Sequence, residues 1–382
     1  MNARIREIGG SVIREIAAKR KPTSIDLGLG EPSLLPNMQH LEKALEHVRE
    51  RGLRYTVNAG DAALRRRIAE HYHYPQLSSA ENVCITTGSQ EATYAVLQTL
   101  LTPGKDELLI VEPAFPSYAK MATLQGATVR SVQMNEAENF AFDPERILAA
   151  VAPATRVIAL CSPCNPTGRT ISADAVAALA EGLQRRPGAP VWILHDEIYR
   201  ELTYTGDAGY AAQRYAHTVV TNSLSKSNAL TGLRLGWAMA PAAIAPHVVK
   251  VHAWLTSCAD TFAQRVALEI FSTPDGLREH AAWYAQQRER VVETLRASGL
   301  RFIVPDGAFY ACVKLPDEAN SLVAAHVLAD DYDVVAVPGV AFGACFAQWL
   351  RLTWVCSIED FSEGLSRIGS FMTDRCTPTL SS

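Results

Sequence analysis

The sequence predicts an α/β protein whose large domain contains a mainly parallel, seven-stranded sheet covered by helices, accompanied by a smaller α/β domain. Between residues 83 and 240, short apolar segments alternate with loops rich in Gly, Pro, Ser or Asn and with helical patterns. The 382 residues, 48% of them hydrophobic, provide enough chain for a large domain and a lobe. We expect an N-terminal arm with part of the small domain at 1–40, the large domain at 41–285 and the small domain at 286–382.

The first 22 residues predict an amphipathic arm or helix that must pack on another element. Its apolar residues recur at helical spacing and do not form the apolar core of a signal peptide: Ile5, Ile8, Val12, Ile13 and Ile16. A short strand begins at Ile25 and is broken by Gly28, Gly30 and Pro32. Helical spacing follows at 39–50 and from Asp61 to about Tyr72, and Tyr55 lies between them in a segment that we expect to be extended.

Seven apolar segments are the predicted strands of the large sheet: 83–87, 107–111, 127–132, 156–161, 190–195, 217–222 and 234–240. Helices are expected between them at about 90–101, 116–125, 144–152 and 172–186. A long helical pattern at 277–298 leads out of this region. The C-terminal third then alternates short strands with helices; the strands are expected at 309–314, 334–337 and 349–354, and the helices at 318–329 and 358–373.

The charge and cysteine patterns exclude several classes of function. The net charge is −4 and the pI is about 6.2, with one short basic run at Arg65–Arg67, so we expect no nucleic acid or anionic membrane as a partner. No apolar stretch is long enough to span a bilayer, and we expect a cytoplasmic protein. Eight scattered cysteines suit reduced thiols. Cys161 and Cys164 have the spacing of a metal or redox pair, but no second pair accompanies them, and we expect no metal.

Lys226 is one of only eight lysines against 28 arginines, and it lies in a turn rich in small hydroxyl residues. A partly desolvated amine near a second cation, here Arg234, becomes a nucleophile towards carbonyl groups because its pKa falls. Ser223, Ser225 and Arg234 could hold a phosphate. Taken alone, this turn fits a solvated surface loop equally well.

Other distinctive residues follow the predicted strands directly, and ligands of parallel sheets bind beyond the carboxyl ends of the strands. Gly88, Ser89 and Gln90 open a helix whose free N–H groups favour a phosphate. Phe115 offers a flat apolar surface. The other residues at this edge are Asn165, Asp196, Tyr199, Ser223 and Lys226. A phosphate cradle, an aromatic plate, a carboxylate and a lysine together fit a phosphorylated aromatic aldehyde, and pyridoxal 5'-phosphate matches each part.

The order and spacing of short motifs resemble the class I (aspartate/aromatic-type) pyridoxal-phosphate-dependent aminotransferases of fold type I. The interval is 31 residues from Asn165 to Asp196, 30 from Asp196 to Lys226 and eight from Lys226 to Arg234. The resemblance covers nearly the whole chain, in Leu29–Pro32, Tyr55 with Ala59-Gly60, Thr87–Ala92, Ser162–Gly168, Asp196–Tyr199, Ser223–Lys226, Gly232–Gly236, Val337–Gly339 and Arg351–Thr353.

The resemblance implies a role for each matching residue. Lys226 would form a Schiff base with the cofactor and move a proton between substrate and cofactor. Asp196 would pair with the pyridine nitrogen of the ring, and Asn165 and Tyr199 would bind its phenolic oxygen. Phe115 would stack on the ring, although many relatives have Trp or Tyr there. Ser89, Gln90, Ser223 and Arg234 would hold the phosphate.

The resemblance also implies a homodimer and a substrate clamp. Tyr55 would reach the phosphate in the neighbouring subunit. The strand at 349–354 places Arg351 opposite its core-facing residues, where it would bind the substrate carboxylate beside Gly30 and Asn165. Such a position is usually only solvent-exposed, and the resemblance favours the binding role.

The expected reaction is ping-pong transfer of an amino group from an L-amino acid to a 2-oxo acid. The apolar segment 33–36 and the pair Phe309-Tyr310 favour neutral or aromatic donors, and no second arginine for an acidic side chain is identifiable. One alternative is a carbon–sulfur lyase or an aminocyclopropane-carboxylate-type synthase on the same scaffold. Others are a cofactor-binding sensor domain of a transcription regulator, which needs a DNA-binding domain, and an inert homologue, which the full set of site residues disfavours.

Overall fold

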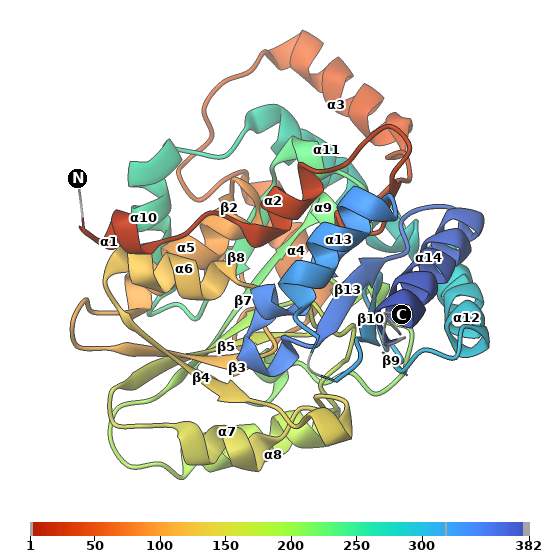
Figure 1. The fold of residues 1–382 in the computed structure, drawn as a ribbon. Coiled ribbons are helices and arrows are strands. Elements are labelled where there is room, and N and C mark those ends of the chain that lie inside the picture. Colours follow the sequence, from red (N-terminus) through yellow and green to blue (C-terminus); the bar gives the residue numbers. More distant parts are fainter. Residues whose placement is uncertain (1–2, 318, 377–382) are drawn as a thin grey trace, which may run out of the picture.

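The computed structural model describes residues 3–317 and 319–376, and its central element is a seven-stranded sheet with the order β2-β8-β7-β6-β5-β3-β4 (Figure 1). β8 runs antiparallel to β2 and β7, and the other neighbouring pairs are parallel. This confirms the predicted fold class. The strands are β2 (Val83–Thr86), β3 (Glu107–Glu112), β4 (Thr128–Gln133), β5 (Thr155–Cys161), β6 (Trp192–Asp196), β7 (Thr218–Ser223) and β8 (Gly236–Met239).

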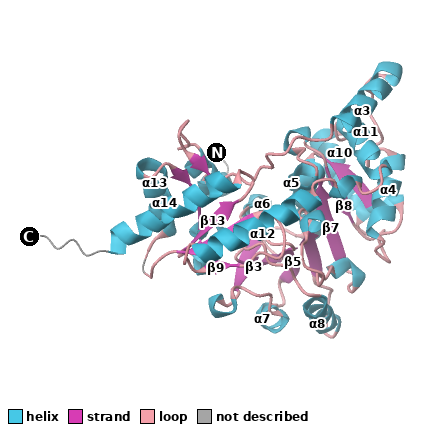
Figure 2. Cartoon of the chain, turned by 90° about the vertical axis from the view of Figure 1, so that its right-hand side faces the viewer, coloured by secondary structure: helices cyan, strands magenta, loops and turns pink. Residues whose placement is uncertain are grey.

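Helices cover both faces of this sheet, because successive strand residues point to opposite sides. On β5, Val157 packs with α5 (Gly88–Leu100), α6 (Ser117–Gln125) and α10 (Ala245–Thr256). Its neighbour Ile158 packs with α7 (Pro144–Ala150) and α8 (Ala173–Gln184). At the other end of that second face, α4 (Ala62–Tyr72) and α11 (Thr261–Ser272) cover β2, β7 and β8. α3 (Met38–Arg51) lies along α11 and projects from the molecule (Figure 2).

The C-terminal third forms a second sheet of four antiparallel strands with the order β12-β13-β10-β9. Its strands are β9 (Phe302–Ile303), β10 (Tyr310–Lys314), β12 (Val337–Pro338) and β13 (Trp349–Thr353). α12 (Ala281–Ala297) leads into it, and α13 (Ser321–Asp331) and α14 (Ile358–Cys376) pack against it, with α12 and α14 side by side (Figure 2).

Residues 12–26 pack on the C-terminal third, whereas residues 3–7 contact α6. β1 (Ile25–Asp26) pairs in parallel with β11 (Val334–Val335). The predicted arm is two short helices, α1 (Ala3–Glu7) and α2 (Val12–Ala17); between them lie Gly9 and Gly10, which disfavour a helix. Ile16 of α2 is fully buried, and Lys19 forms an ion pair with Asp330 at 2.6 Å.

Two sequence predictions for residues 234–276 differ from the structure. The strand expected at 234–240 begins at Gly236, because Arg234 adopts a left-handed backbone conformation with φ of 55°. No element is predicted between 241 and 276, where the structure has α10 and α11.

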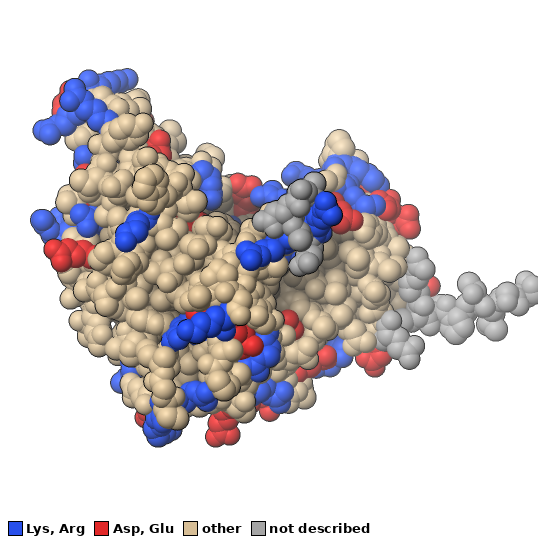
Figure 3. Space-filling model, turned by 90° about the vertical axis from the view of Figure 1, so that its left-hand side faces the viewer, with Lys and Arg blue, Asp and Glu red and all other residues tan. Residues whose placement is uncertain are grey.

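On the face shown in Figure 3, Lys and Arg side chains lie in separate groups over a mostly uncharged surface. Within residues 3–317 and 319–376, no helix combines the length and apolar character needed to cross a bilayer.

Candidate active site

A cavity of about 650 Å³ opens at the carboxyl ends of the central strands. Ten of the twelve predicted site residues line it, and they come from loops far apart in the sequence: Gly30, Ser89, Gln90, Phe115, Asn165, Asp196, Tyr199, Lys226, Arg234 and Arg351. The clustering follows from the parallel strands, because their carboxyl ends share one edge of the sheet.

Lys226 lies in α9 (Leu224–Ser227), a single helical turn directly after β7. The hydroxyl of Ser223 accepts a hydrogen bond from the Ser225 N–H at 2.9 Å and caps this turn. The Lys226 Nζ donates to the Gly30 carbonyl at 2.5 Å. Burial and the nearby charge of Arg351 lower the pKa of Lys226 from 10.5 to about 8, against the opposing charge of Glu31. A large part of the lysine population is therefore neutral in mildly alkaline solution.

Asp196 is the last residue of β6 and is buried. Its Oδ2 accepts a hydrogen bond from the Tyr118 hydroxyl at 2.6 Å. Its Oδ1 accepts weaker bonds from the Thr221 hydroxyl and the Ile198 N–H, both at 3.3 Å. Burial raises the pKa of Asp196 from 3.8 to about 6, although these hydrogen bonds oppose the shift. A cationic ligand group beside this carboxylate would therefore be strongly attracted.

Arg351 is buried on β13, on the side of the strand that faces the cavity. One Nη donates to the Asn165 Oδ1 at 3.1 Å, and the other donates to the Gly28 carbonyl. The guanidinium carbon lies 4.4 Å from the centre of the Tyr310 ring. Its Nε is buried without a hydrogen-bond partner, and within the described ranges no carboxylate forms an ion pair with Arg351. A buried guanidinium in this state is suited to bind a carboxylate ligand.

The N-terminus of α5 forms a cradle for an anion. Gly88 has a φ of 79°, and a Cβ there would meet the Arg234 guanidinium at 2.6 Å. A Cβ on Gly236 would meet the Ser89 backbone nitrogen at 2.5 Å, so β8 also passes close to this turn. The free N–H groups at the start of a 13-residue helix, with a guanidinium beside them, fit a phosphate group.

Tyr199 and Tyr310 share a hydrogen bond of 2.6 Å between their hydroxyl groups. Gly30 passes so close to Tyr310 that a Cβ would overlap its hydroxyl, which explains the glycine at this position. Phe115 lines the cavity beside Tyr118, with the two rings edge to face at 6.0 Å.

Two predicted residues lie elsewhere in this chain. Ser223 is buried under α9 and is not among the cavity-lining residues. Tyr55 is 88% exposed and does not line the cavity. Their predicted contacts with the phosphate stay predictions, and that of Tyr55 requires a second subunit.

Three further residues line the cavity: Tyr118, to which the sequence assigned no role, Tyr310, considered only for donor preference, and Ser225, considered only as a possible phosphate partner. Tyr118 meets Asp196 across 78 residues and Tyr310 meets Tyr199 across 111 residues, so no local pattern could reveal these contacts. Ser225 could have been given more weight, since it immediately precedes Lys226 in the same turn.

The fold and the cavity together define a protein of the aminotransferase type. The chain belongs to the family described as aminotransferase class I and II, whose model matches residues 22–368. It is 32% identical over 379 residues to an aspartate aminotransferase of Pyrococcus horikoshii, covering 96% of this chain and 95% of that protein. It is 33% identical to an arginine–pyruvate transaminase of Pseudomonas aeruginosa, covering 90% and 88% of the two chains. The crystal structure of an aspartate aminotransferase of Thermotoga maritima superimposes with a TM-score of 0.90 and 29% identity, over 98% of this chain and 100% of that one.

The chain is therefore an enzyme, a transaminase, and its cofactor is pyridoxal phosphate, on which this family depends. The residues of the cavity fit this cofactor. The cradle at α5 suits its phosphate, the buried Asp196 suits a protonated ring nitrogen, and the partly neutral Lys226 suits its aldehyde. The relatives are named for different amino acids, so their names assign no substrate to this chain.

Proposed function

We propose that this enzyme transfers the amino group of an L-amino acid to a 2-oxo acid by a ping-pong mechanism, with Lys226 as the attachment point of the cofactor and the proton carrier. The observation that supports it most directly is the convergence of Lys226, Asp196 and Arg351 on one cavity. Bound pyridoxal phosphate supplies an aldehyde that reacts with amines and a ring that accepts electrons from the substrate Cα.

Arg351 and Lys226 act on the substrate. Arg351, held by Asn165 and the Gly28 carbonyl, binds the α-carboxylate and fixes the orientation of Cα. The Lys226 Nζ then takes the proton from Cα and returns it in the next step, for which a pKa lowered to about 8 is suitable.

Other residues hold the cofactor. Asp196 keeps a proton on the ring nitrogen, and Tyr118 holds the carboxylate in place. Asn165 and Tyr199 would bind the phenolic oxygen, and Phe115 would stack on the ring. Ser89, Gln90 and Arg234 hold the phosphate, joined by Ser223 through the α9 turn that it caps and by Ser225.

We propose that the active unit is a homodimer in the cytoplasm, in which Tyr55 reaches the neighbouring site. Leu53, Tyr55 and Val57 are 62%, 88% and 64% exposed, and Trp254 is 88% exposed. The Asn58 side chain donates to the Ser257 carbonyl at 2.7 Å, which joins the segment of Tyr55 to the end of α10, where Trp254 lies. An exposed apolar surface of this kind favours association with a second copy.

The domain division at 1–40, 41–285 and 286–382 is part of the same proposal. The pairing of β1 with β11 and the burial of Ile16 support assigning the N-terminal arm to the small domain. A small domain that carries Arg351 could move over the cavity while the large sheet holds the cofactor.

The donor class stays open between neutral or aromatic amino acids, which we expect from the sequence, and charged ones. Two charged residues at the cavity are not assigned to the cofactor or to the α-carboxylate: Arg14 and Glu31. Glu31 accepts a hydrogen bond from the Thr231 hydroxyl. No partner of the Arg14 guanidinium is found among the described residues.

The test is a panel of L-amino acids, neutral, aromatic, acidic and basic, each supplied with pyruvate or 2-oxoglutarate. Transamination predicts equal amounts of a new amino acid and a new oxo acid, and initial rates that give parallel lines in a double-reciprocal plot. Ammonia and an oxo acid formed without any acceptor would indicate the lyase alternative.

A further inference from the structure

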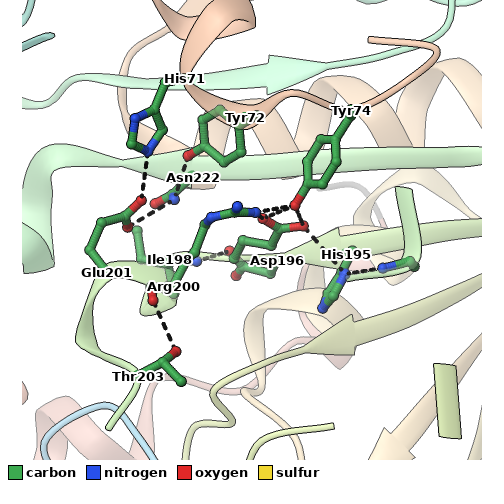
Figure 4. Close-up of polar contacts among 12 residues, drawn as sticks. His71, Tyr72, Tyr74, His195, Asp196, Ile198, Arg200, Glu201, Thr203 and Asn222 are labelled. Atoms are coloured by element: carbon green, nitrogen blue, oxygen red, sulfur yellow. Dashed lines mark hydrogen bonds and ion pairs between the residues drawn. The ribbon is translucent and has the colours of Figure 1, made fainter. Parts of the chain in front are cut away.

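Three residues that are adjacent in sequence to predicted cofactor residues form one buried polar network. Glu197 follows Asp196, Arg200 follows Tyr199, and Asn222 precedes Ser223. Glu197 pairs with Arg200, whose guanidinium lies over the Tyr72 ring, and the Asn222 amide donates to the hydroxyl of the same Tyr72, the last residue of α4 (Figure 4).

Glu197 and Arg200 form the centre of this network. Glu197 is fully buried, and its carboxylate accepts from the Arg200 guanidinium at 2.9 Å and from the Tyr74 hydroxyl at 2.7 Å. The same guanidinium also donates to the Tyr74 hydroxyl. Its carbon lies 4.8, 5.3 and 4.0 Å from the ring centres of Tyr72, Tyr74 and Tyr210. A planar guanidinium between three rings and a carboxylate has little freedom to move.

Asn222 extends the network to β7. Its amide donates to the Tyr72 hydroxyl at 2.7 Å and to the Glu201 carboxylate at 3.4 Å, and its Oδ1 accepts from the Ser223 N–H at 2.6 Å. His71 lies 3.7 Å from the other oxygen of Glu201. The network therefore joins the turn after β6 to the start of the Lys226 turn.

The negative charge of Glu197 depends on its partners in the network. Burial raises the pKa of Glu197 to about 7, and the charge of Arg200 and the Tyr74 hydroxyl oppose this shift. Burial lowers the pKa of the adjacent His195 to about 3, so His195 is neutral. Loss of either member of a buried ion pair leaves an uncompensated charge in a medium of low dielectric constant.

Backbone hydrogen bonds also hold the turn after β6, which carries Glu197 and Arg200. The Glu197 N–H donates to the Thr221 carbonyl at 2.8 Å, and the Arg200 N–H donates to the Glu197 carbonyl at 2.9 Å. Asp196 directly precedes Glu197 and Tyr199 directly precedes Arg200, so side-chain contacts that fix Glu197 and Arg200 also restrict the backbone from which Asp196 and Tyr199 project. The network thus controls two groups that face the ring of the cofactor.

We propose that the Glu197–Arg200 pair is a positioning element for the reaction, which sets the orientation of Asp196 and Tyr199 towards the cofactor. This proposal rests on the proposed cofactor contacts of Asp196 and Tyr199. It assigns the pair a role in cofactor binding and catalysis in addition to stability.

The test compares Arg200→Met, Arg200→Lys and Glu197→Gln with Arg130→Met. Arg130 also pairs with a buried glutamate, Glu107, at 2.8 Å on the same sheet, although its side chain is more exposed than that of Arg200, and neither residue of this pair lines the cavity. For each variant we would measure the melting temperature of the apoprotein, the Kd of pyridoxal phosphate, the pH midpoint of the bound cofactor's absorbance, and kcat per bound cofactor.

A positioning role predicts that Arg200→Met weakens cofactor binding about tenfold or more, moves the pH midpoint and lowers kcat more than it raises KM. Arg200→Lys should restore part of each change, because it keeps the charge and loses the planar group. Arg130→Met should lower only the melting temperature. If Arg200→Met does not fold, Arg200→Lys and Glu197→Gln should still move the pH midpoint.

Unchanged cofactor affinity and pH midpoint in the folded variants, with only a lower melting temperature, would overturn the proposal. The cofactor measurements need no substrate, so they separate this proposal from the proposed reaction. A wild-type protein that binds pyridoxal phosphate but transfers no amino group would contradict the proposed function and leave the cofactor measurements valid.

Discussion

Arg351 of β13 donates a hydrogen bond of 3.1 Å to the Asn165 Oδ1, across 186 residues of sequence. This contact joins the four-stranded sheet to the loop after β5 of the large sheet. In the proposed mechanism, this contact would fix the group that binds the substrate carboxylate relative to a group that binds the cofactor ring, which favours a reactive geometry.

Replacing Arg351 should weaken the binding of every amino-acid donor to a similar degree. We expect Arg351→Gln to raise KM by about tenfold to hundredfold, the loss of a charge-assisted hydrogen bond. Steady-state kinetics with one neutral, one aromatic and one acidic donor would measure this. A loss confined to a single donor would show that Arg351 reads a side chain and not the α-carboxylate.

The depressed pKa of Lys226 predicts how fast the apoprotein binds its cofactor covalently. Only the neutral amine attacks an aldehyde, so the rate should rise with pH and level off above about 8. Arg351→Gln removes a cation that lowers this pKa and should move the midpoint to higher pH. Stopped-flow mixing of apoprotein with pyridoxal phosphate measures both midpoints, and a midpoint near the ordinary value of 10.5 would contradict the assignment.

The same shift predicts a pH-dependent stability of the apoprotein. Between about 8 and 10.5, the unfolded chain holds a proton on Lys226 that the folded chain has lost. The unfolded state then binds more protons, so the free energy of unfolding should gain a positive contribution as pH rises through this window. Below pH 8 both states are protonated and the cost of burying the charge is fully present. Urea unfolding of Lys226→Met should lack this contribution; an identical pH profile for both proteins would refute it.

The homodimer proposal can be tested by mixing two defective proteins. Lys226→Ala removes the proton carrier, and Tyr55→Phe should weaken cofactor binding, by about tenfold for a phosphate contact. A hybrid dimer contains one site with both defects and one with Lys226 and Tyr55 intact. Activity at limiting cofactor should therefore recover after unfolding and refolding of the mixture. No recovery, despite hybrid dimers detected by a tag on one subunit, would place Tyr55 outside the neighbouring site.

Arg14 should affect donors according to the charge of their side chains. Arg14 lines the cavity and has no role in the proposed binding of the cofactor or the α-carboxylate. We expect Arg14→Ala to lower kcat/KM for aspartate and glutamate by about tenfold relative to alanine and phenylalanine. Arg20→Gln provides a control on the same arm, where Arg20 makes an exposed pair with Asp26 at 3.6 Å. Equal effects on acidic and neutral donors would exclude Arg14 from side-chain recognition.

The large sheet could be predicted from sequence because its strands are buried on both faces. β2 is fully buried along its length and reads as a mainly apolar segment between loop residues, and β3 and β5 contain the continuous apolar runs Leu108–Val111 and Val157–Leu160. Arg234 shows the limit of this signal. It lies two residues before β8, and its left-handed backbone prevents the strand from starting earlier. A single sequence does not reveal that conformation.

The site could be predicted in part, for a related reason. Residues directly after strands meet at one edge, so the positions of Asp196 and Lys226 follow from topology. Tyr118 of α6 donates to Asp196, which ends β6. Arg200, in the turn after β6, donates to Tyr74, which follows α4. Contacts of this kind depend on the three-dimensional packing of helices, which no spacing in the sequence specifies.

The most direct test of the central claim is the absorbance spectrum of the holoenzyme during addition of single L-amino acids without an oxo acid. The account predicts that the band of the Lys226-bound cofactor disappears and the band of pyridoxamine phosphate replaces it, with one equivalent of oxo acid released per site. Lys226→Ala should lose this conversion by roughly 10⁴-fold, and Lys105→Ala should retain it. A band that persists with every donor, or a wild-type spectrum identical to that of Lys226→Ala, would contradict the assignment of Lys226 and the transamination mechanism.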